Sequence, residues 1–271
     1  MSQNNIDIFK NTIHLLENDC TLRRSLLCAE IANKNTFLYK HSPEAVPRSR
    51  TKTYATIESV TNESVIQCAL RLSKKTAGRI AVLSFSNPGS PGGGVEDGAF
   101  TQEASICRLS DFYPRLLEKA RLGVFYDKSV TTPYDDQVLY SRDVAIIKPD
   151  IPNPVLFEEC ERLRIDVACC AAPNQNEQEL SYDELYEIIE KRISLVLDSC
   201  LENGATNVVL GAWGCGALKN PPQTMISAMM SAISEEYTWA FENLIFAVPD
   251  SGSSQINYNI FHEKVKYWYY P

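Results

Sequence analysis

Two glycine-bearing segments of this chain carry the residue types that hold anionic ligands. They are SNPGSPGGGVEDGAFTQEAS at residues 86–105 and LGAWGCGALKNPP at residues 210–222. Gly92, Gly93 and Gly94 have no Cβ, so their backbone can adopt positive φ angles and lie directly against a ligand. Successive backbone N–H groups that point into one concavity bind phosphate or pyrophosphate. The chemistry expected here is therefore the binding of a phosphate-bearing molecule.

The second segment repeats this arrangement with Gly214 and Gly216, preceded by Gly211. Each segment follows a short apolar run that predicts a buried strand, IAVLSF at residues 80–85 and NVVLGAW at residues 207–213. We therefore expect both loops to leave the carboxyl ends of strands in one sheet, where open α/β folds bind ligands. One glycine run alone is typical of a plain turn, whereas two such loops after two buried strands indicate a ligand site.

The first segment resembles the signature of the poly(ADP-ribose) glycohydrolases, especially the microbial-type group, whose fold is a macrodomain. The resemblance consists of a strand, Asn-Pro, three glycines, the stretch Val95 to Thr101, and then Gln102-Glu103. WGCGA at residues 213–217 is similar to the second, pyrophosphate-holding loop of that family. Weaker resemblances extend it over about residues 50–262, at 139–150, 165–174 and 243–250. The resemblance implies ligand contacts from Asn87, Gly92, Gly93, Gly94, Val95, Gln102, Trp213, Gly214, Cys215, Gly216, Ala217 and Leu218.

The sequence departs from the family pattern at two places. In the family, a second glutamate follows the Gln-Glu pair and is the catalytic residue, but Ala104 stands at that position here. The family usually has Phe-Gly after the Gly-Cys-Gly-Ala segment, where this chain has Leu218-Lys219. The first departure removes the catalytic acid of the family, and the second removes the aromatic residue that packs near the distal ribose in the family.

The alanine matters because cleavage of a ribose O-glycosidic bond passes through an oxocarbenium-like transition state, and the departing oxygen must receive a proton. An alanine cannot supply that proton. Glu103 is the nearest carboxylate, but adjacent residues point in different directions, and the resemblance gives Glu103 a contact with ribose hydroxyls. Ala104 and Glu103 are therefore the two candidate catalytic positions. The sequence leaves open whether the alanine is natural or engineered.

Three functional hypotheses follow. The first is a hydrolase of ADP-ribose conjugates or polymer ends, active despite Ala104 or inactivated by it. The second is a non-catalytic reader that binds ADP-ribose through the same loops. The third is a nucleotide-binding or structural domain that keeps only the scaffold. The expected partners are ADP-ribose or ADP-ribosylated macromolecules, and no cofactor is expected.

Composition and charge argue against several other classes of function. The chain has 271 residues, 44% of them hydrophobic, and a net charge of −8, which argues against binding of bare DNA or RNA. Nine cysteines without a CxxC pair indicate free thiols in a reducing compartment, and three scattered histidines argue against a metal site. Without a membrane-spanning run or a signal peptide, we expect a cytoplasmic protein.

The alternation of helical and strand patterns predicts a three-layer α/β/α sandwich around a mixed sheet, in line with the macrodomain that the motifs suggest. We expect an N-terminal helical extension at residues 1–50, packed on a domain at residues 51–271. The ending KVKYWYYP predicts a strand or a packed tail. Helices are expected at about residues 5–34, 62–75 with Asn62 as its cap, 101–112 ending short of Pro114, 181–201 and 223–237.

Overall fold

The fold is a layered α/β structure, described by a computed structural model. The described residues are 2–22, 34–43, 57–127, 129, 131–132, 134–250 and 255–268. Within them, seven strands form one sheet in the order β1-β4-β5-β3-β6-β7-β2. The strands are β1 (Thr36–Tyr39), β2 (Ile57–Thr61), β3 (Ile80–Phe85), β4 (Val138–Ile146), β5 (Leu163–Cys170), β6 (Asn207–Leu210) and β7 (Asn243–Ala247).

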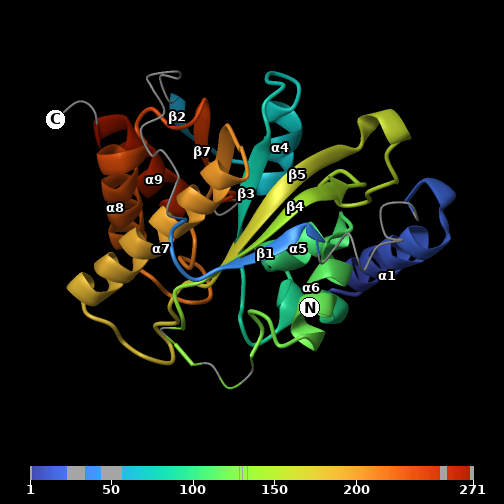
Figure 1. Cartoon of the computed structure of the whole chain (residues 1–271), viewed down its shortest axis with the longest axis horizontal. Coiled ribbons are helices and arrows are strands. Elements are labelled where there is room, and N and C mark those ends of the chain that lie inside the picture. Colours follow the sequence, from blue (N-terminus) through green and yellow to red (C-terminus); the bar gives the residue numbers. More distant parts are fainter. Residues whose placement is uncertain are drawn as a thin grey trace.

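The sheet is mixed. Strands β5, β3, β6, β7 and β2 pair in parallel, while β4 runs antiparallel to both β5 and β1. The helical elements are α1 (Gln3–Asn18), α4 (Val65–Leu72), η1 (Pro91–Asp97), α5 (Gln102–Arg108), α6 (Phe112–Arg121), η2 (Glu159–Glu161), α7 (Tyr182–Glu202), α8 (Pro222–Ala232), η3 (Ile233–Tyr237) and α9 (Ile256–Trp268). Figure 1 shows α7, α8 and α9 on one side of the sheet and α1, α5 and α6 on the other. The predicted three-layer sandwich is confirmed.

The central strand β3 shows why the sheet carries helices on both faces. Its side chains alternate between the faces, as strand geometry requires, and every one from Ile80 to Leu83 is apolar and buried. Ala81 and Leu83 belong to the core beneath α7, α8 and α9. Ile80 and Val82 belong to the core beneath α1, α4, α5 and α6. A strand that is apolar on both faces needs cover on both faces.

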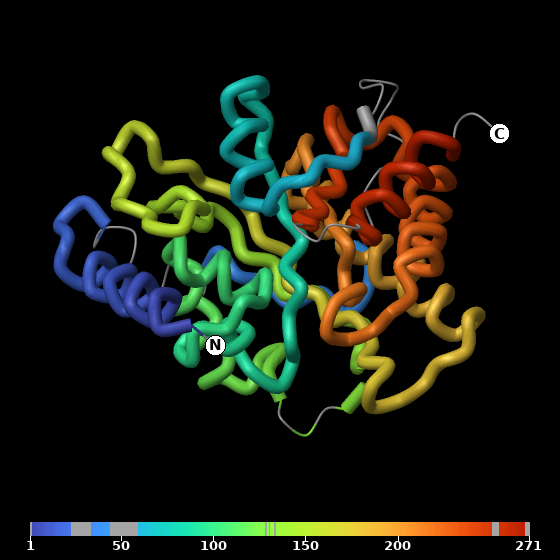
Figure 2. Tube along the Cα trace, turned by 180° about the vertical axis from the view of Figure 1, so that it is seen from behind, coloured from blue at the N-terminus to red at the C-terminus, as the bar shows by residue number. Residues whose placement is uncertain are grey.

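The N-terminal helix α1 lies against the segment that contains the first glycine loop. The backbone N–H of Ser2 and the side-chain amide of Asn5 both donate to the Gly98 carbonyl, at 3.0 and 3.2 Å. The buried Lys148 ammonium donates to Asn11 Oδ1 and to Thr12 Oγ1, both at 2.8 Å. Figure 2 shows this helix beside the η1 and α5 region. The division at residues 50 and 51 stays a prediction.

Three sequence expectations about helices need correction. The helix expected from Asn62 begins at Val65, capped by Ser64 and Gln67 in a reciprocal capping box. The helix expected at 101–112 is two helices, α5 and α6, and Pro114 lies in the first turn of the second. The ending, expected to be a strand or a packed tail, is helical from residue 264 to 268, at the end of α9, and Val265 packs in the core. The expected helix at 5–34 extends into residues 23–33, outside the described residues.

None of the helices in the described part of the chain is long and apolar enough to cross a bilayer. The same residues hold no group of three or more His, Cys, Asp or Glu side chains that could bind a metal ion. Five of the cysteines are buried, Cys20 and Cys160 are exposed, Cys215 is half-buried, and Cys28 lies outside the described residues.

Candidate ligand site at the carboxyl ends of β3 and β6

The two glycine loops leave neighbouring strands at the same edge of the sheet. β3 and β6 are adjacent and parallel, and Val82 pairs with Val209. Residues 86–105 follow the carboxyl end of β3, and residues 211–220 follow the carboxyl end of β6. The expectation that both loops leave the carboxyl ends of strands in one sheet is therefore confirmed.

The first loop contains three successive residues in the left-handed region. Gly92, Gly93 and Gly94 have φ angles of 77°, 57° and 83° inside the 3₁₀ segment η1. A Cβ at Gly93 would lie 2.6 Å from Thr101 Oγ1, and one at Gly92 would lie 2.6 Å from the Tyr113 ring. Only glycine satisfies both the backbone conformation and this close packing, so the predicted positive φ angles are confirmed at all three positions.

Gln102 joins the start of α5 to the end of β3. Its side-chain amide donates to the Leu83 carbonyl at 2.7 Å, and its Oε1 accepts from the Phe85 N–H at 3.0 Å. The amide thus links the end of β3 to the first turn of α5. Its predicted contact with a ligand stays a prediction.

Glu103 is a fully buried carboxyl beneath the first loop. Its Oε1 accepts from Ser86 Oγ at 2.8 Å and from the Tyr126 hydroxyl at 3.3 Å. Its Oε2 has no hydrogen-bond partner among the described residues and would lie 3.2 Å from a Cβ built on Gly93. Burial raises the pKa of Glu103 to about 8, so this side chain keeps its proton at neutral pH.

Ala104 is also fully buried, and it brings no acid to the site. Its N–H donates at 3.2 Å to Thr101 Oγ1, which caps α5. Its methyl group belongs to the same apolar cluster as Val95 and Tyr113. In this structure the position that the family resemblance assigns to the catalytic carboxylate therefore presents only a methyl group in an apolar environment.

In the second loop the glycines have different roles. Gly214 has a φ of 73°, and a Cβ there would lie 2.3 Å from Asn220 Nδ2. Gly211 does not have a positive φ, but a Cβ there would lie 2.7 Å from the Ala247 carbonyl oxygen. A Cβ on Gly216 would meet nothing within 4 Å, so this glycine faces open space.

The carbonyl groups of the second loop are turned toward residues 174–176. The Leu218 carbonyl accepts from the Gln175 N–H at 3.1 Å, and the Ala217 carbonyl accepts from Asn176 Nδ2 at 2.8 Å. Backbone N–H groups of the loop, in contrast, find no acceptor among the described residues. These unpaired N–H groups belong to Gly214, Gly216, Ala217 and Leu218.

Three side chains donate to backbone carbonyls at the end of β5 and just after it, and two of them, Trp213 and Asn220, belong to the second loop. The buried Trp213 donates from Nε1 to the Cys170 carbonyl at 3.2 Å, and Arg192 donates from Nη1 to the Ala171 carbonyl at 2.9 Å. Asn220 donates from Nδ2 to the Pro173 carbonyl at 2.9 Å. Arg192 and Asn220 were not among the predicted site residues. The only sequence signal for Arg192 is a cation within the apolar stripe of α7.

The remaining predicted residues lie at the edges of the two loops. Asn87 is exposed, and its Oδ1 accepts from the Gly89 N–H at 2.8 Å. Val95 is buried in η1. Burial raises the pKa of the Cys215 thiol to about 12, so it stays protonated and is a poor nucleophile at neutral pH. The structure brings all the predicted residues to one edge of the sheet, and their ligand contacts stay predictions.

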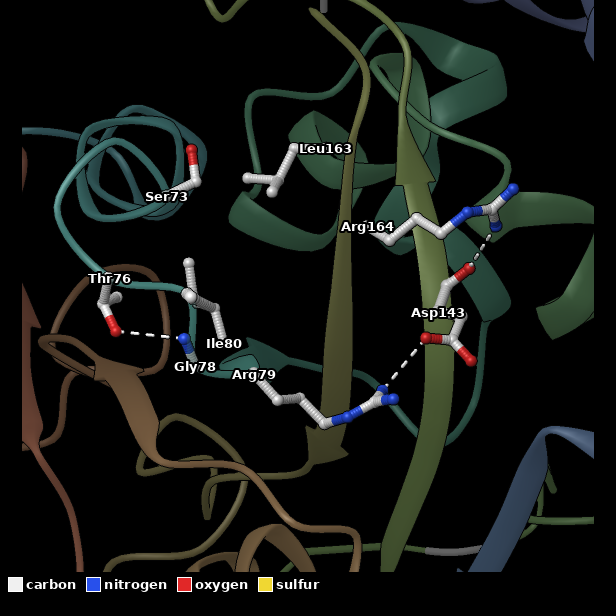
Figure 3. Close-up of a pocket in the computed structure, with 9 residues that line it drawn as sticks. Ser73, Thr76, Gly78, Arg79, Ile80, Asp143, Leu163 and Arg164 are labelled. Carbon is white, nitrogen blue, oxygen red and sulfur yellow. Dashed lines mark hydrogen bonds and ion pairs between the residues drawn. The ribbon is translucent and has the colours of Figure 1, made fainter. Parts of the chain in front are cut away.

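A separate cavity of about 540 Å³ lies at the opposite edge, where the parallel strands begin (Figure 3). Arg79 lines it and forms ion pairs of 3.0 Å with Asp143 and 2.8 Å with Asp166. Arg164 donates to the Asp143 carbonyl at 3.2 Å. The Arg79 guanidinium is therefore already paired, and the cavity is separate from the glycine-loop site.

Comparisons with known proteins agree with this geometry. Poly(ADP-ribose) glycohydrolase from Thermomonospora curvata, bound to the inhibitor ADP-HPD, has a TM-score of 0.84 and 25% identity, over 97% of this chain and 100% of its own. The enzyme from Deinococcus radiodurans in complex with ADP-ribose has a TM-score of 0.75 and 26% identity, over 89% and 98%. No curated protein matches the sequence.

A model of the family described as microbial-type PARG, catalytic domain, matches residues 3–149. This range includes the first glycine loop and the Gln102-Glu103 pair, but ends before β5 and the second loop. The structural similarity to the two bacterial enzymes covers the rest of the fold. The chain therefore belongs to the microbial-type poly(ADP-ribose) glycohydrolase family.

Proposed function

We propose that this protein binds ADP-ribose, free or attached to macromolecules, between its two glycine loops. The observation that carries the proposal is the pairing of these loops on the adjacent parallel strands β3 and β6. Four backbone N–H groups of the second loop lack a partner in the described structure, which is the arrangement that an anionic group needs. The two bacterial relatives, bound to ADP-HPD and to ADP-ribose, support the same ligand.

We further propose that the unmodified chain cleaves ribose O-glycosidic bonds slowly, and that it acts chiefly as an ADP-ribose reader. A positioned general acid contributes about 10²- to 10⁴-fold to such a reaction. Ala104, at the position of the family's catalytic glutamate, offers no proton to the leaving oxygen. Binding and orientation by the loops would remain.

The second candidate is a glycosidase in which Glu103 supplies the proton. Two observations favour it: burial raises the pKa of Glu103 to about 8, and its Oε2 has no partner in the described residues. A carboxyl that stays protonated at neutral pH has the protonation state that a general acid needs. The complete burial of this side chain beneath Gly93 argues against the role, because the leaving oxygen of a substrate would have to reach the carboxyl.

Binding is tested with Gly216→Val, because a Cβ at this exposed position meets no protein atom within 4 Å and adds bulk beside the unpaired N–H groups of the loop. Calorimetric titration with ADP-ribose should show at least about a tenfold loss of affinity, equivalent to 1.4 kcal/mol, with an unchanged unfolding midpoint. Ala77→Val, exposed at the opposite edge of the sheet, is the control and should bind normally.

Gly93→Val is a less specific probe. We expect this variant to lose stability as well as binding, because Gly93 has a φ of 57° and a Cβ there would meet the Thr101 hydroxyl. If the unmodified chain gives no calorimetric response to millimolar ADP-ribose, the proposed ligand is wrong. Hydrolysis by the unmodified chain that disappears in Glu103→Gln would favour the glycosidase over the reader.

The proposed setting is the cytoplasm, with ADP-ribosylated macromolecules as partners. The net charge of −8 supports recognition of the ADP-ribose group rather than of bare nucleic acid. The cysteines of the described residues are free thiols, which agrees with a reducing compartment.

A further inference from the structure

Lys219, in the second loop, adopts a backbone conformation that lysine rarely takes. Its φ is 57°, and only four other non-glycine residues of the described structure have a positive φ. The left-handed region is unfavourable for residues with a Cβ, and a lysine side chain cannot compensate locally as asparagine and aspartate do. Such conformations persist where the surroundings impose them, and they occur often at ligand sites.

Lys219 directly follows the residues of the second loop whose N–H groups are unpaired. Its own N–H donates to the Gly216 carbonyl at 3.0 Å, which closes a turn through Ala217 and Leu218. The N–H groups of Gly216, Ala217 and Leu218 have no acceptor in the described part of the chain. The Lys219 side chain is exposed and forms no ion pair with any described residue.

An unpaired cation within one turn of unpaired N–H groups gives a site two ways to bind an anion. Backbone N–H groups hold phosphate oxygens at fixed positions, and a lysine adds a mobile point charge on a flexible stem. In a chain with a net charge of −8, a diphosphate approaching this edge also needs a local positive charge.

We propose that Lys219 pairs with a phosphate group of the bound ligand, and so selects a diphosphate-bearing nucleotide. This inference rests on the proposed ADP-ribose binding and assigns to it one side chain. The strained φ of Lys219 is then retained because a glycine at this position would relieve the strain but lose the charge.

The test is Lys219→Gly, because relief of the backbone strain should favour stability, whereas loss of the charge should lower affinity. The unfolding midpoint should stay the same or rise by up to about 3 °C, since glycine accepts the positive φ. The affinity for ADP-ribose should fall about 3- to 10-fold, and raising the salt concentration should weaken binding less than in the unmodified chain. Lys219→Arg keeps the charge and should keep most of the affinity.

Asp143→Gly is the matched control, because Asp143 also has a positive φ, 55°, and a charged side chain, but lies at the opposite edge of the sheet. It should leave affinity unchanged. Equal affinity and equal salt dependence in Lys219→Gly would overturn the inference while the proposed function stands. A loss of affinity accompanied by a fall in the unfolding midpoint, and not restored by Lys219→Arg, would show that Lys219 only supports the loop. If the unmodified chain does not bind ADP-ribose, both proposals are wrong.

Discussion

Ser86 donates a hydrogen bond from its Oγ to Oε1 of Glu103, at 2.8 Å, and so ties the end of β3 to the first turn of α5. The Tyr126 hydroxyl donates to the same oxygen at 3.3 Å. A single carboxyl oxygen of α5 thus accepts hydrogen bonds from two other segments, the end of β3 and the stretch that contains Tyr126. The charge state of this carboxyl therefore bears directly on the hydrogen bonds of Ser86 and Tyr126.

Glu103→Gln should change how stability depends on pH. The pKa of Glu103 is about 8 in the folded protein and about 4.5 in the unfolded chain, so between these values the folded state holds an extra proton. The free energy of unfolding then falls as pH rises through this window, by at most about 1.4 kcal/mol per pH unit for one proton. The glutamine variant cannot ionise and should lose this slope.

Denaturant unfolding at pH 5, 6, 7 and 8 measures that slope. Glu187→Gln, at an exposed position on α7, is the control and should keep it. A slope that is the same in the unmodified chain and in Glu103→Gln would show that Glu103 ionises in the folded protein as it does in the unfolded chain.

Ala104→Glu should raise the rate of hydrolysis of ADP-ribose conjugates by at least about 10²-fold, the lower range for a positioned general acid. Affinity should change little or fall slightly, and some stability should be lost because residue 104 is fully buried in an apolar cluster. Ala104→Gln has a similar shape without an acid, so it should bind but stay slow.

Two results would contradict this account of Ala104. Fast hydrolysis by the unmodified chain would mean that another group, with Glu103 first, supplies the proton. An Ala104→Glu variant that binds ADP-ribose tightly but stays inactive would mean that other residues of the site, such as Leu218 and Lys219, have also departed from catalysis.

Trp213→Ala should destabilise the fold by about 3–5 kcal/mol, the cost of removing a large buried side chain. Trp213 has no exposed surface, and its Nε1 is bonded to the Cys170 carbonyl. Trp239→Ala serves as the comparison, because Trp239 is 44% exposed and its loss should cost much less. Thermal unfolding of both variants measures the difference, and equal midpoints would show that Trp213 does not anchor the second loop.

Asn220→Ala should lower both stability and affinity for ADP-ribose. Its buried amide donates to the Pro173 carbonyl at 2.9 Å and to the Gly214 carbonyl at 3.2 Å, and the loss of these bonds should cost about 1–3 kcal/mol. Asn176→Ala removes one exposed bond to the same loop and should cost less than about 1 kcal/mol. A smaller effect at Asn220 than at Asn176 would be contrary to its supporting role.

The elements that local patterns determine were predictable. β3 has the predicted bounds, because an uninterrupted apolar run specifies a strand buried on both faces. α7 begins after Ser181, as its capping box with Glu184 indicates. At α4 the sequence offers several capping residues in succession, and Ser64 caps the helix because Gln67 lies three residues later and completes a box.

Contacts between distant segments were not predictable in the same way. Ser110 pairs with Ile146 of β4, and this bridge separates α5 from α6. Pro114 then fits the first turn of α6, where a missing N–H costs little. Arg192 and Asn220 bind backbone carbonyls of segments far away in the sequence, so no local pattern marks them.

The adjacency of β3 and β6 also determines when the site can exist during folding. The first loop follows Phe85 and the second follows Leu210, so closing the site requires a pairing between distant parts of the chain, which is entropically costly. A nascent chain that has not yet emerged beyond residue 222 holds at most one half of the site. Any ligand that contacts both loops must therefore bind the completed sheet. Because such a ligand binds only the folded state, its binding stabilises the whole fold rather than either loop alone.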